Sequence, residues 1–442
     1  MKKRRKRRGV SLGTVFMLLL TAAVMIACAM FFVMLVGDGL YEKTGALIRS
    51  LSERGLFEQE LPAERVPTTT VSAAVAAAYV AEDTAAPSAP SATPRPAPQP
   101  VTFTVSAAGT VYAPKAVRES VQAGGRYDFA PVFAGLGDTL SGADLAICTL
   151  ETTTAGRDKG FGNYNTAPEI LDGLRSCGVD LLSLGTEHAL DKGYEGLDLT
   201  VSELTARGLN YAGIYPDGIN SGATMLSIGG AQVAVLAYAY GLSDEGEKKT
   251  DGDEQGALAM LDVNAMIRDI TQARVSGANL VIVLPHWGTK NKAETADTVR
   301  RMARQLAEAG ADVILGTHPN VAQGTERLTV PRSDGLEHDA VVCYSLGSLL
   351  TDARAAENTA GMIAHVSVTY DPATRRTTLG EMYCTPVYIA SQREDGGRVY
   401  RVVDAESSGQ LESLEESERQ AAQAALEHIR SVTAADGQEG QG

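Results

Sequence analysis

The chain has few cysteines, and their spacing excludes two common uses of this residue. Five cysteines occur in 442 residues, and four of them lie beyond the N-terminal region: Cys148, Cys177, Cys343 and Cys384. No two have the C-x-x-C spacing of a zinc knuckle or a redox pair. Cys148 and Cys343 lie inside apolar runs typical of strands, where a thiol usually packs as a small hydrophobe. An extracytoplasmic location would permit disulfides among the four, but nothing in the sequence requires them.

Most of the chain also lacks an excess of basic residues. Residues 2–8 hold seven of the 39 Lys and Arg residues. The remainder therefore has 32 against 54 Asp and Glu, a formal net charge of −22. A body this acidic repels the phosphate backbone of a nucleic acid. We therefore expect no nucleic-acid partner.

An uncharged run over residues 9–37 follows the basic head, residues 1–8, and predicts a transmembrane anchor. Its core, residues 15–36, has the 22 residues needed to cross a hydrocarbon layer of about 30 Å as a helix. A cleaved signal peptide has an apolar region of only about 7–15 residues, and no small-x-small cleavage site follows here. The basic head predicts a single-pass protein of the cell membrane, with a cytoplasmic amino terminus and an extracytoplasmic body. A lipoprotein with Cys28 as its mature amino terminus is the alternative.

The composition divides the rest of the chain into four parts. Residues 38–60 predict a juxtamembrane segment. Residues 61–100 are rich in Ala, Pro and Thr and predict a disordered stalk, because such a segment cannot bury enough apolar surface to offset its ordering entropy. Residues 101–400 predict the globular domain. Residues 401–442 predict an acidic tail with one weak helix, over 411–429.

Within the globular part, short apolar runs alternate with helical patterns, which predicts an α/β sheet. Glycines at 229 and 230 predict a hairpin, and the last strands are expected to be antiparallel, with a turn at Asp371-Pro372. The expected strands are 101–107, 145–150, 179–184, 280–284, 313–315, 340–345, 362–370 and 377–384, and the expected helices are 129–140, 168–177, 194–207, 263–275 and 293–309.

Four of these expected strands end at an acidic residue or a histidine. They lead into Glu151, the pair Glu187-His188, His286 and His318. Open α/β sheets bind ligands beyond the carboxyl ends of their strands. The repetition therefore predicts one composite site at this edge.

The motifs around these residues resemble the poly-γ-glutamate capsule-synthesis (CapA-like) family. The resemblance extends from about residue 101 to residue 386, and the motifs that carry it are 144–151, 178–193, 286–288, 310–319 and 344–347. It implies a calcineurin-like metallophosphoesterase-type fold, a layered α/β/β/α sandwich. It also implies a role with a capsule or other cell-envelope polymer such as poly-γ-glutamate, and that polymer or capsule-synthesis proteins as partners.

Four positions depart from the metal-ligand pattern of that family. Thr110 stands where the family has Asp, Thr149 and Thr186 each replace an Asn, and Asn320 replaces a His. A two-metal hydrolytic site needs such ligands to hold two cations about 3.5–4 Å apart, so we do not expect a full dinuclear centre. The residues predicted to hold a single Zn²⁺ or Mn²⁺ ion, if one is bound, are Glu187, His286 and His318.

Other surviving polar positions have more than one interpretation. His188 is predicted to be the catalytic proton donor, or it caps a turn. Trp287, the only tryptophan, is predicted to bind substrate, or it packs at the strand end. Glu151 is also predicted to bind substrate, and the three threonines after it favour exposure. Asp191 is interpreted as a cap of the helix that begins near Gly193.

Two functions are therefore open. The first is a binding or assembly protein for an extracytoplasmic polymer, with a degenerate metal site. The second is an extracytoplasmic metal-dependent hydrolase of a phosphoester or an amide, in which His188 protonates the leaving group. Metal content separates them, because the hydrolase must hold at least one ion.

Overall fold

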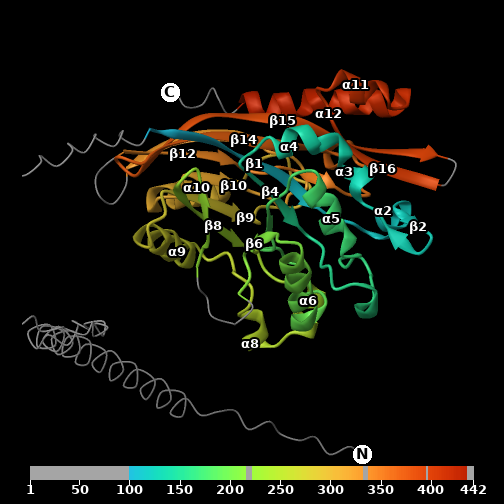
Figure 1. Cartoon of the computed structure of the whole chain (residues 1–442), viewed down its shortest axis with the longest axis horizontal. Coiled ribbons are helices and arrows are strands. Elements are labelled where there is room, and N and C mark those ends of the chain that lie inside the picture. Colours follow the sequence, from blue (N-terminus) through green and yellow to red (C-terminus); the bar gives the residue numbers. More distant parts are fainter. Residues whose placement is uncertain (1–98, 216–221, 332–336, 395–396, 436–442) are drawn as a thin grey trace, which may run out of the picture. The chain divides into compact units, whose positions relative to one another are not determined.

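The computed structural model describes residues 99–215, 222–331, 337–394 and 397–435 (Figure 1). The predicted anchor, the juxtamembrane segment and nearly all of the predicted stalk lie outside these residues. None of the helices in the described ranges is both long and apolar enough to cross a membrane. All of the described residues belong to one compact unit, Pro94–Gly442.

The first sheet within the described residues has eight strands. Strands β1, β4, β5 and β6 run parallel, and β14, β15 and β16 extend the sheet beyond β1 with antiparallel pairing. The order is β16 (Gly397–Asp404), β15 (Arg376–Glu394), β14 (Ala360–Asp371), β1 (Val101–Val111), β4 (Leu145–Leu150), β5 (Leu181–Ser183) and β6 (Asn210–Ala212), and β13 (Ser348–Leu350) also pairs with β1.

The second sheet has six strands, and its four central ones run parallel. Its order is β11 (Thr325–Pro331), β12 (Glu337–Cys343), β10 (Val313–Leu315), β9 (Leu280–Pro285), β8 (Ala231–Tyr238) and β7 (Thr224–Ile228). The β7–β8 hairpin turns at Gly229 and Gly230, as predicted. A separate two-stranded hairpin joins β2 (Gln122–Ala123) to β3 (Arg126–Tyr127).

Helices cover the outer faces of the two sheets. Those of the first sheet include α2 (Lys115–Ser120), α3 (Ala130–Phe133), α4 (Gly137–Ser141), α5 (Glu169–Ser176) and α6 (Gly193–Ala206). Those of the second are α9 (Val263–Val275) and α10 (Asp297–Ala309). The short α7 (Asp244–Lys249) and α8 (Gly252–Gln255) lie between β8 and α9 in the chain.

Three apolar clusters establish the order of the layers. Between the sheets, Val105 and Ile147 of the first pack with Ile282 of the second. Alternate residues of the same strands face outward, so Cys148 packs with the helices on one side and Val281 with those on the other. β4 and β9 are buried on both faces. This explains why the sequences of these strands are nearly continuous apolar runs. The predicted α/β/β/α sandwich is therefore observed.

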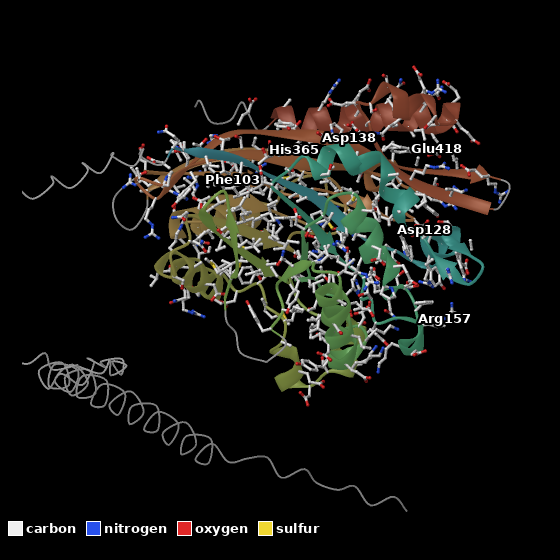
Figure 2. The ribbon with its side chains drawn as sticks, viewed as in Figure 1. Phe103, Asp128, Asp138, Arg157, His365 and Glu418 are labelled. Carbon is white, nitrogen blue, oxygen red and sulfur yellow. The ribbon has the colours of Figure 1, made fainter. Side chains whose placement is uncertain are left out.

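The C-terminal strands and helix extend the globular fold past residue 400. α11 (Ser408–Glu412) and α12 (Glu416–Ala435) follow β16, and Ala422 and Ile429 of α12 are buried against the first sheet. Glu418, labelled in Figure 2, accepts a hydrogen bond from the Tyr388 hydroxyl at 2.9 Å. The segment predicted as an acidic tail thus contributes to the core up to α12.

Two expected helices differ from the prediction. The helix expected over 129–140 is divided into α3, a 3-10 turn at Ala134–Leu136, and α4. Gly135 lies against β16 here, and a Cβ on it would come within 2.6 Å of the Val402 carbonyl oxygen. The helix expected from residue 293 begins at Asp297, because the side-chain amide of Gln323 holds the preceding segment through the carbonyls of Lys292 and Glu294.

Candidate metal and substrate site

The predicted site residues converge at the carboxyl ends of the parallel strands. Glu151 follows β4, Glu187 and His188 follow β5, His286 follows β9, and His318 follows β10. A backbone bridge between His286 and Thr317 continues the parallel pairing of β9 and β10 past the strand ends. The edges of both sheets therefore contribute to one cluster, so the predicted convergence of these side chains is observed.

Glu187 is the centre of this cluster. His286 Nε2 and His318 Nδ1 each donate a hydrogen bond of 2.9 Å to the same oxygen, Glu187 Oε2. The ligating atoms of these three residues lie within 4.8 Å of one another. Two imidazole nitrogens and a carboxylate oxygen suit zinc or manganese. The three residues predicted as ligands thus fit a single divalent ion.

His188 belongs to a second group of ligating atoms that shares Glu187. The atoms of Glu151, Glu187 and His188 also lie within 4.8 Å of one another. His188 Nδ1 donates to Asp191 Oδ2 at 2.9 Å, and the Ser243 hydroxyl donates to the other oxygen of Asp191. The ring of Tyr164 stacks on the His188 ring with 3.3 Å between centroids. These contacts fix the imidazole and leave its buried Nε2 without a hydrogen bond among the described residues.

Lys290 brings a cation to this second group. Its Nζ lies 2.7 Å from Glu187 Oε1 and 3.8 Å from Glu151 Oε1. Sequence reasoning missed this residue, although it stands four positions after His286 in the loop that follows β9. Its place in the loop that follows β9 is the only sequence signal that indicates it.

The environment sets the charge on each group. Burial alone would raise the pKa of Glu187, but the hydrogen bonds from His286 and His318 outweigh it and hold the pKa well below its usual range. Burial, and then the charge of Glu187, raises the pKa of Glu151 to about 8. Burial lowers the pKa of His286 to about 4. At neutral pH Glu187 is therefore ionised and His286 is neutral, the forms in which both bind a metal ion.

The departures from the family pattern lie in the same place. Thr110 and Thr149 are buried, and Thr110 and Asn320 line a cavity of about 270 Å³ together with Glu151. The hydroxyl of Thr110, the hydroxyl of Thr186 and Oδ1 of Asn320 are buried and have no hydrogen-bond partner in the described part of the chain. These positions supply neutral polar atoms where the sequence resemblance implies metal ligands.

Three interpretations from the sequence are wrong. Trp287 is 1% exposed, and its indole nitrogen donates to the Tyr344 carbonyl at 2.9 Å, so its ring packs in the core and is not free to stack on a ligand. The exposure expected for Glu151 and the three threonines after it is not observed, because Glu151 is 2% exposed and the threonines are also buried. Asp191 does not cap α6, whose N-cap residue, Lys192, makes no side-chain cap hydrogen bond; it binds His188 instead.

Tyr240 is the exposed aromatic residue at the site. It is 63% exposed, and its ring lies 5.3 Å from that of His318 in a stacked arrangement. Tyr240 comes two residues after β8, so it follows the same strand-end rule as the histidines. From the sequence, the residues before Tyr240 are expected only as part of a hairpin around Gly229 and Gly230, and not as a strand that leads into the site.

Backbone strain marks the loop after β10. His318 has φ +97° and Asn320 has φ +58°, and both lie in a region that non-glycine residues rarely occupy. Such a conformation costs roughly 1–3 kcal/mol and is typical of ligand-binding sites. In this backbone conformation the imidazole of His318 contacts Glu187.

Two cavities adjoin the cluster. The cavity that contains Thr110 and Asn320 shares Tyr164 with a second one of about 380 Å³, lined by His188, Asp191 and Ser243. Tyr164 therefore stands between them, over His188. His188 lines the second cavity and not the first.

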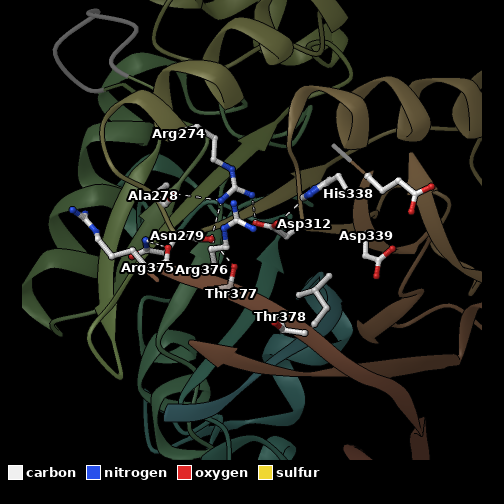
Figure 3. A pocket seen from close by; sticks show the side chains of 12 residues that line it. Arg274, Ala278, Asn279, Asp312, His338, Asp339, Arg375, Arg376, Thr377 and Thr378 are labelled. Carbon is white, nitrogen blue, oxygen red and sulfur yellow. Dashed lines mark hydrogen bonds and ion pairs between the residues drawn. The ribbon is translucent and has the colours of Figure 1, made fainter. Parts of the chain in front are cut away.

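A larger cavity, of about 610 Å³, lies elsewhere, at the amino ends of β9 and β10 (Figure 3). Arg274 crosses it and pairs with Asp312, whose carboxylate also accepts from the Val281 amide at 2.6 Å. Figure 3 shows the Arg376 side chain directed toward this pair and that of Arg375 directed away. None of the predicted site residues lines this cavity.

The fold and this cluster define an α/β protein with a metal-capable site between two sheet edges. Residues 104–353, more than half of the chain, match the sequence model of the family described as bacterial capsule synthesis protein PGA_cap. The chain belongs to this family.

Curated relatives agree with this assignment. The chain is 27% identical over 194 residues to the PGA biosynthesis protein CapA of Bacillus subtilis, covering 43% of this chain and 47% of that protein. It is 25% identical over 264 residues to the capsule biosynthesis protein CapA of Bacillus anthracis, covering 56% and 60%. The chain thus spans about half the length of the curated relatives it matches.

Among solved structures, the chain is similar to a calcineurin-like phosphoesterase from Bacillus subtilis. The TM-score is 0.38 with 14% sequence identity, over 75% of this chain and all of that chain.

Proposed function

We propose that this chain acts in the synthesis or assembly of a cell-envelope polymer of the poly-γ-glutamate type. In this proposal it is a single-pass membrane protein with an extracytoplasmic body, and its site holds one divalent ion. The polymer or capsule-synthesis proteins are its partners. The basic head and the apolar run over residues 9–37 support the membrane part of the proposal.

The observation that carries the proposal is the convergence of Glu187, His286 and His318 inside the family-matched region. Glu187 follows β5 of the first sheet, whereas His286 and His318 follow β9 and β10 of the second. Both histidines nevertheless contact the same carboxylate oxygen of Glu187. When bound there, a divalent ion supplies positive charge that stabilises negative charge on a carbonyl or phosphoryl oxygen. The neutral Thr110 and Asn320 do not supply the charged and imidazole ligands of a full second centre.

A second candidate function is hydrolysis, and the pair formed by His188 and Asp191 favours it. Asp191 holds Nδ1 of His188, so that Nε2 faces Glu151 and Glu187 at 3.9 and 3.6 Å. An imidazole oriented in this way can hold a proton at Nε2 and give it to a leaving group. The bond broken would be an amide or a phosphoester.

Deletion of the gene distinguishes the two functions, because they predict opposite changes in the amount of cell-bound polymer. For a synthesis or assembly protein, we expect the cell-bound γ-glutamyl polymer to fall to a small fraction of its normal amount. For a hydrolase, the polymer should increase in amount or in chain length. The polymer is measured as glutamate released by acid hydrolysis and by size on a gel. The wild-type gene should restore the normal amount, and a Glu187→Gln gene should not; an unchanged polymer in the deletion strain would contradict both functions.

Protease treatment of intact cells tests the topology. Protease added from outside should cut within residues 61–100 and release the body, because the composition of this segment predicts no packed structure that would protect it. The released fragment is identified by mass spectrometry. A body that is protected until the membrane is opened would show that the orientation is wrong. A lipid-modified Cys28 at the mature amino terminus would show that the protein is a lipoprotein.

A further inference from the structure

The ammonium group of Lys290 contacts a second set of possible metal ligands, Glu151, Glu187 and His188. The proposed single ion uses only one of these three residues, Glu187. Glu151, Glu187 and His188 could together hold a cation. Lys290 contacts both carboxylates of this set, at 3.8 and 2.7 Å. The third member, Nε2 of His188, is buried and has no hydrogen bond in the described ranges. The set thus has a complete group of ligands and a side-chain cation already in contact with it.

The loop after β9 presents Lys290 from a fixed position. It turns at Gly288, with φ +87°, and at Asn291, with φ +57°. The amide of Asn291 donates to the Pro319 carbonyl at 2.8 Å, and the side chain of Asn358 donates to Asn291 Oδ1 at 2.9 Å. Because Asn291, the residue after Lys290, is tied to two neighbouring loops, little ordering is needed to bring the ammonium group to the carboxylates.

The buried, ionised carboxylate of Glu187 needs a compensating positive charge, and the carboxyl group of Glu151 lies beside it. Glu151 is 2% exposed and Glu187 is 7% exposed. A buried carboxylate remains ionised only when it is paired or binds a metal ion. An ammonium group and a divalent ion would compete for this set, because like charges a few ångströms apart repel strongly away from water. Lysine can take this place because its charge is compact and its stem is flexible.

We infer that Lys290 is the resident cation of the Glu151–Glu187–His188 set and that it excludes a second metal ion. The inference rests on the single-ion site of the proposed function, at Glu187, His286 and His318. A tethered ammonium group thus stands where a second ion would otherwise bind, and the protein is restricted to one ion.

The test is the metal stoichiometry of the purified full chain in detergent, measured with Zn²⁺ by titration calorimetry and by elemental analysis after dialysis. We expect the wild type to bind one ion and Lys290→Met to bind two. Lys290→Arg retains the charge and should bind one. Lys292→Met is the matched control: it lies two residues further along the same loop, is exposed, has no ion pair among the described residues, and should bind one ion.

Each result has a defined meaning. One ion in the wild type and two in Lys290→Met would support the inference. One ion in both proteins would overturn it and leave the single-ion site of the proposed function intact. Two ions in the wild type would overturn it as well, because the lysine would then exclude nothing. No ion in either protein would overturn both the single-ion site and the inference.

Discussion

Glu187→Gln should weaken zinc binding by at least about 100-fold, a loss larger than the 10–100-fold that changes beyond the direct ligands usually cause. Glu187 is the only carboxylate in its group with His286 and His318, and both histidines contact one of its oxygens. A neutral amide keeps the shape of the side chain and removes the negative charge that attracts the ion. The measurement is the dissociation constant of Zn²⁺ by competition with a chelating dye at pH 7.

The matched control is Glu195→Gln. Glu195 pairs with Lys159 on the surface, and its side chain is 73% exposed. The same chemical change there should leave zinc affinity unaltered, because an exposed charge at a distance is screened by salt. If Glu187→Gln bound zinc as tightly as the wild type, the ion would lie elsewhere. The fluorescence of Trp287, the only tryptophan of the chain, shows whether the variant is folded.

The sequence predicted the position of this site because parallel strands impose it. Glu151, Glu187, His286 and His318 each follow a strand, and the carboxyl ends of parallel strands share one edge. This rule needs only the strand assignments, which short buried apolar runs alternating with helical patterns indicate. It also applies to Tyr240, where the strand had been assigned only to a hairpin.

Contacts made by loops were not predictable in the same way. Lys290 reaches Glu187 because its loop turns at Gly288 and Asn291 and is tied to Pro319, and no periodic pattern encodes such a path. Asp191 was interpreted from its neighbours as a helix cap. Its partners are His188, three residues before it, and Ser243, 52 residues after it, and only tertiary structure brings Ser243 to it.

The broken helix has a similar explanation. Residues 129–140 have a helical apolar pattern, but Gly135 must accept the close approach of β16. The strand that causes this break lies more than 250 residues later in the chain. Local pattern therefore predicted the amphipathic character of the segment and not its interruption.

Trp287→Ala should lower the free energy of unfolding by about 3–5 kcal/mol, the usual cost of removing a large buried aromatic side chain. Trp287 is 1% exposed and packs against the second sheet, where its ring lies so near Gly316 that a Cβ on Gly316 would be 2.3 Å from the indole nitrogen. Unfolding of the full chain in detergent is followed by far-ultraviolet circular dichroism in denaturant, since the variant has no tryptophan fluorescence.

Tyr240→Ala is the matched aromatic control, and it should weaken ligand binding while leaving the free energy of unfolding almost unchanged. Tyr240 is 63% exposed, so its removal should change stability by no more than about 0.5 kcal/mol. Its ring lies beside that of His318, and loss of its apolar contact with one methylene of a γ-glutamyl oligomer, about 0.8 kcal/mol, should weaken binding of the oligomer about 4-fold. Binding is measured by calorimetry with a short oligomer. If Trp287→Ala instead kept its stability and lost oligomer binding, while Tyr240→Ala bound normally, the ligand-stacking role would belong to Trp287 after all.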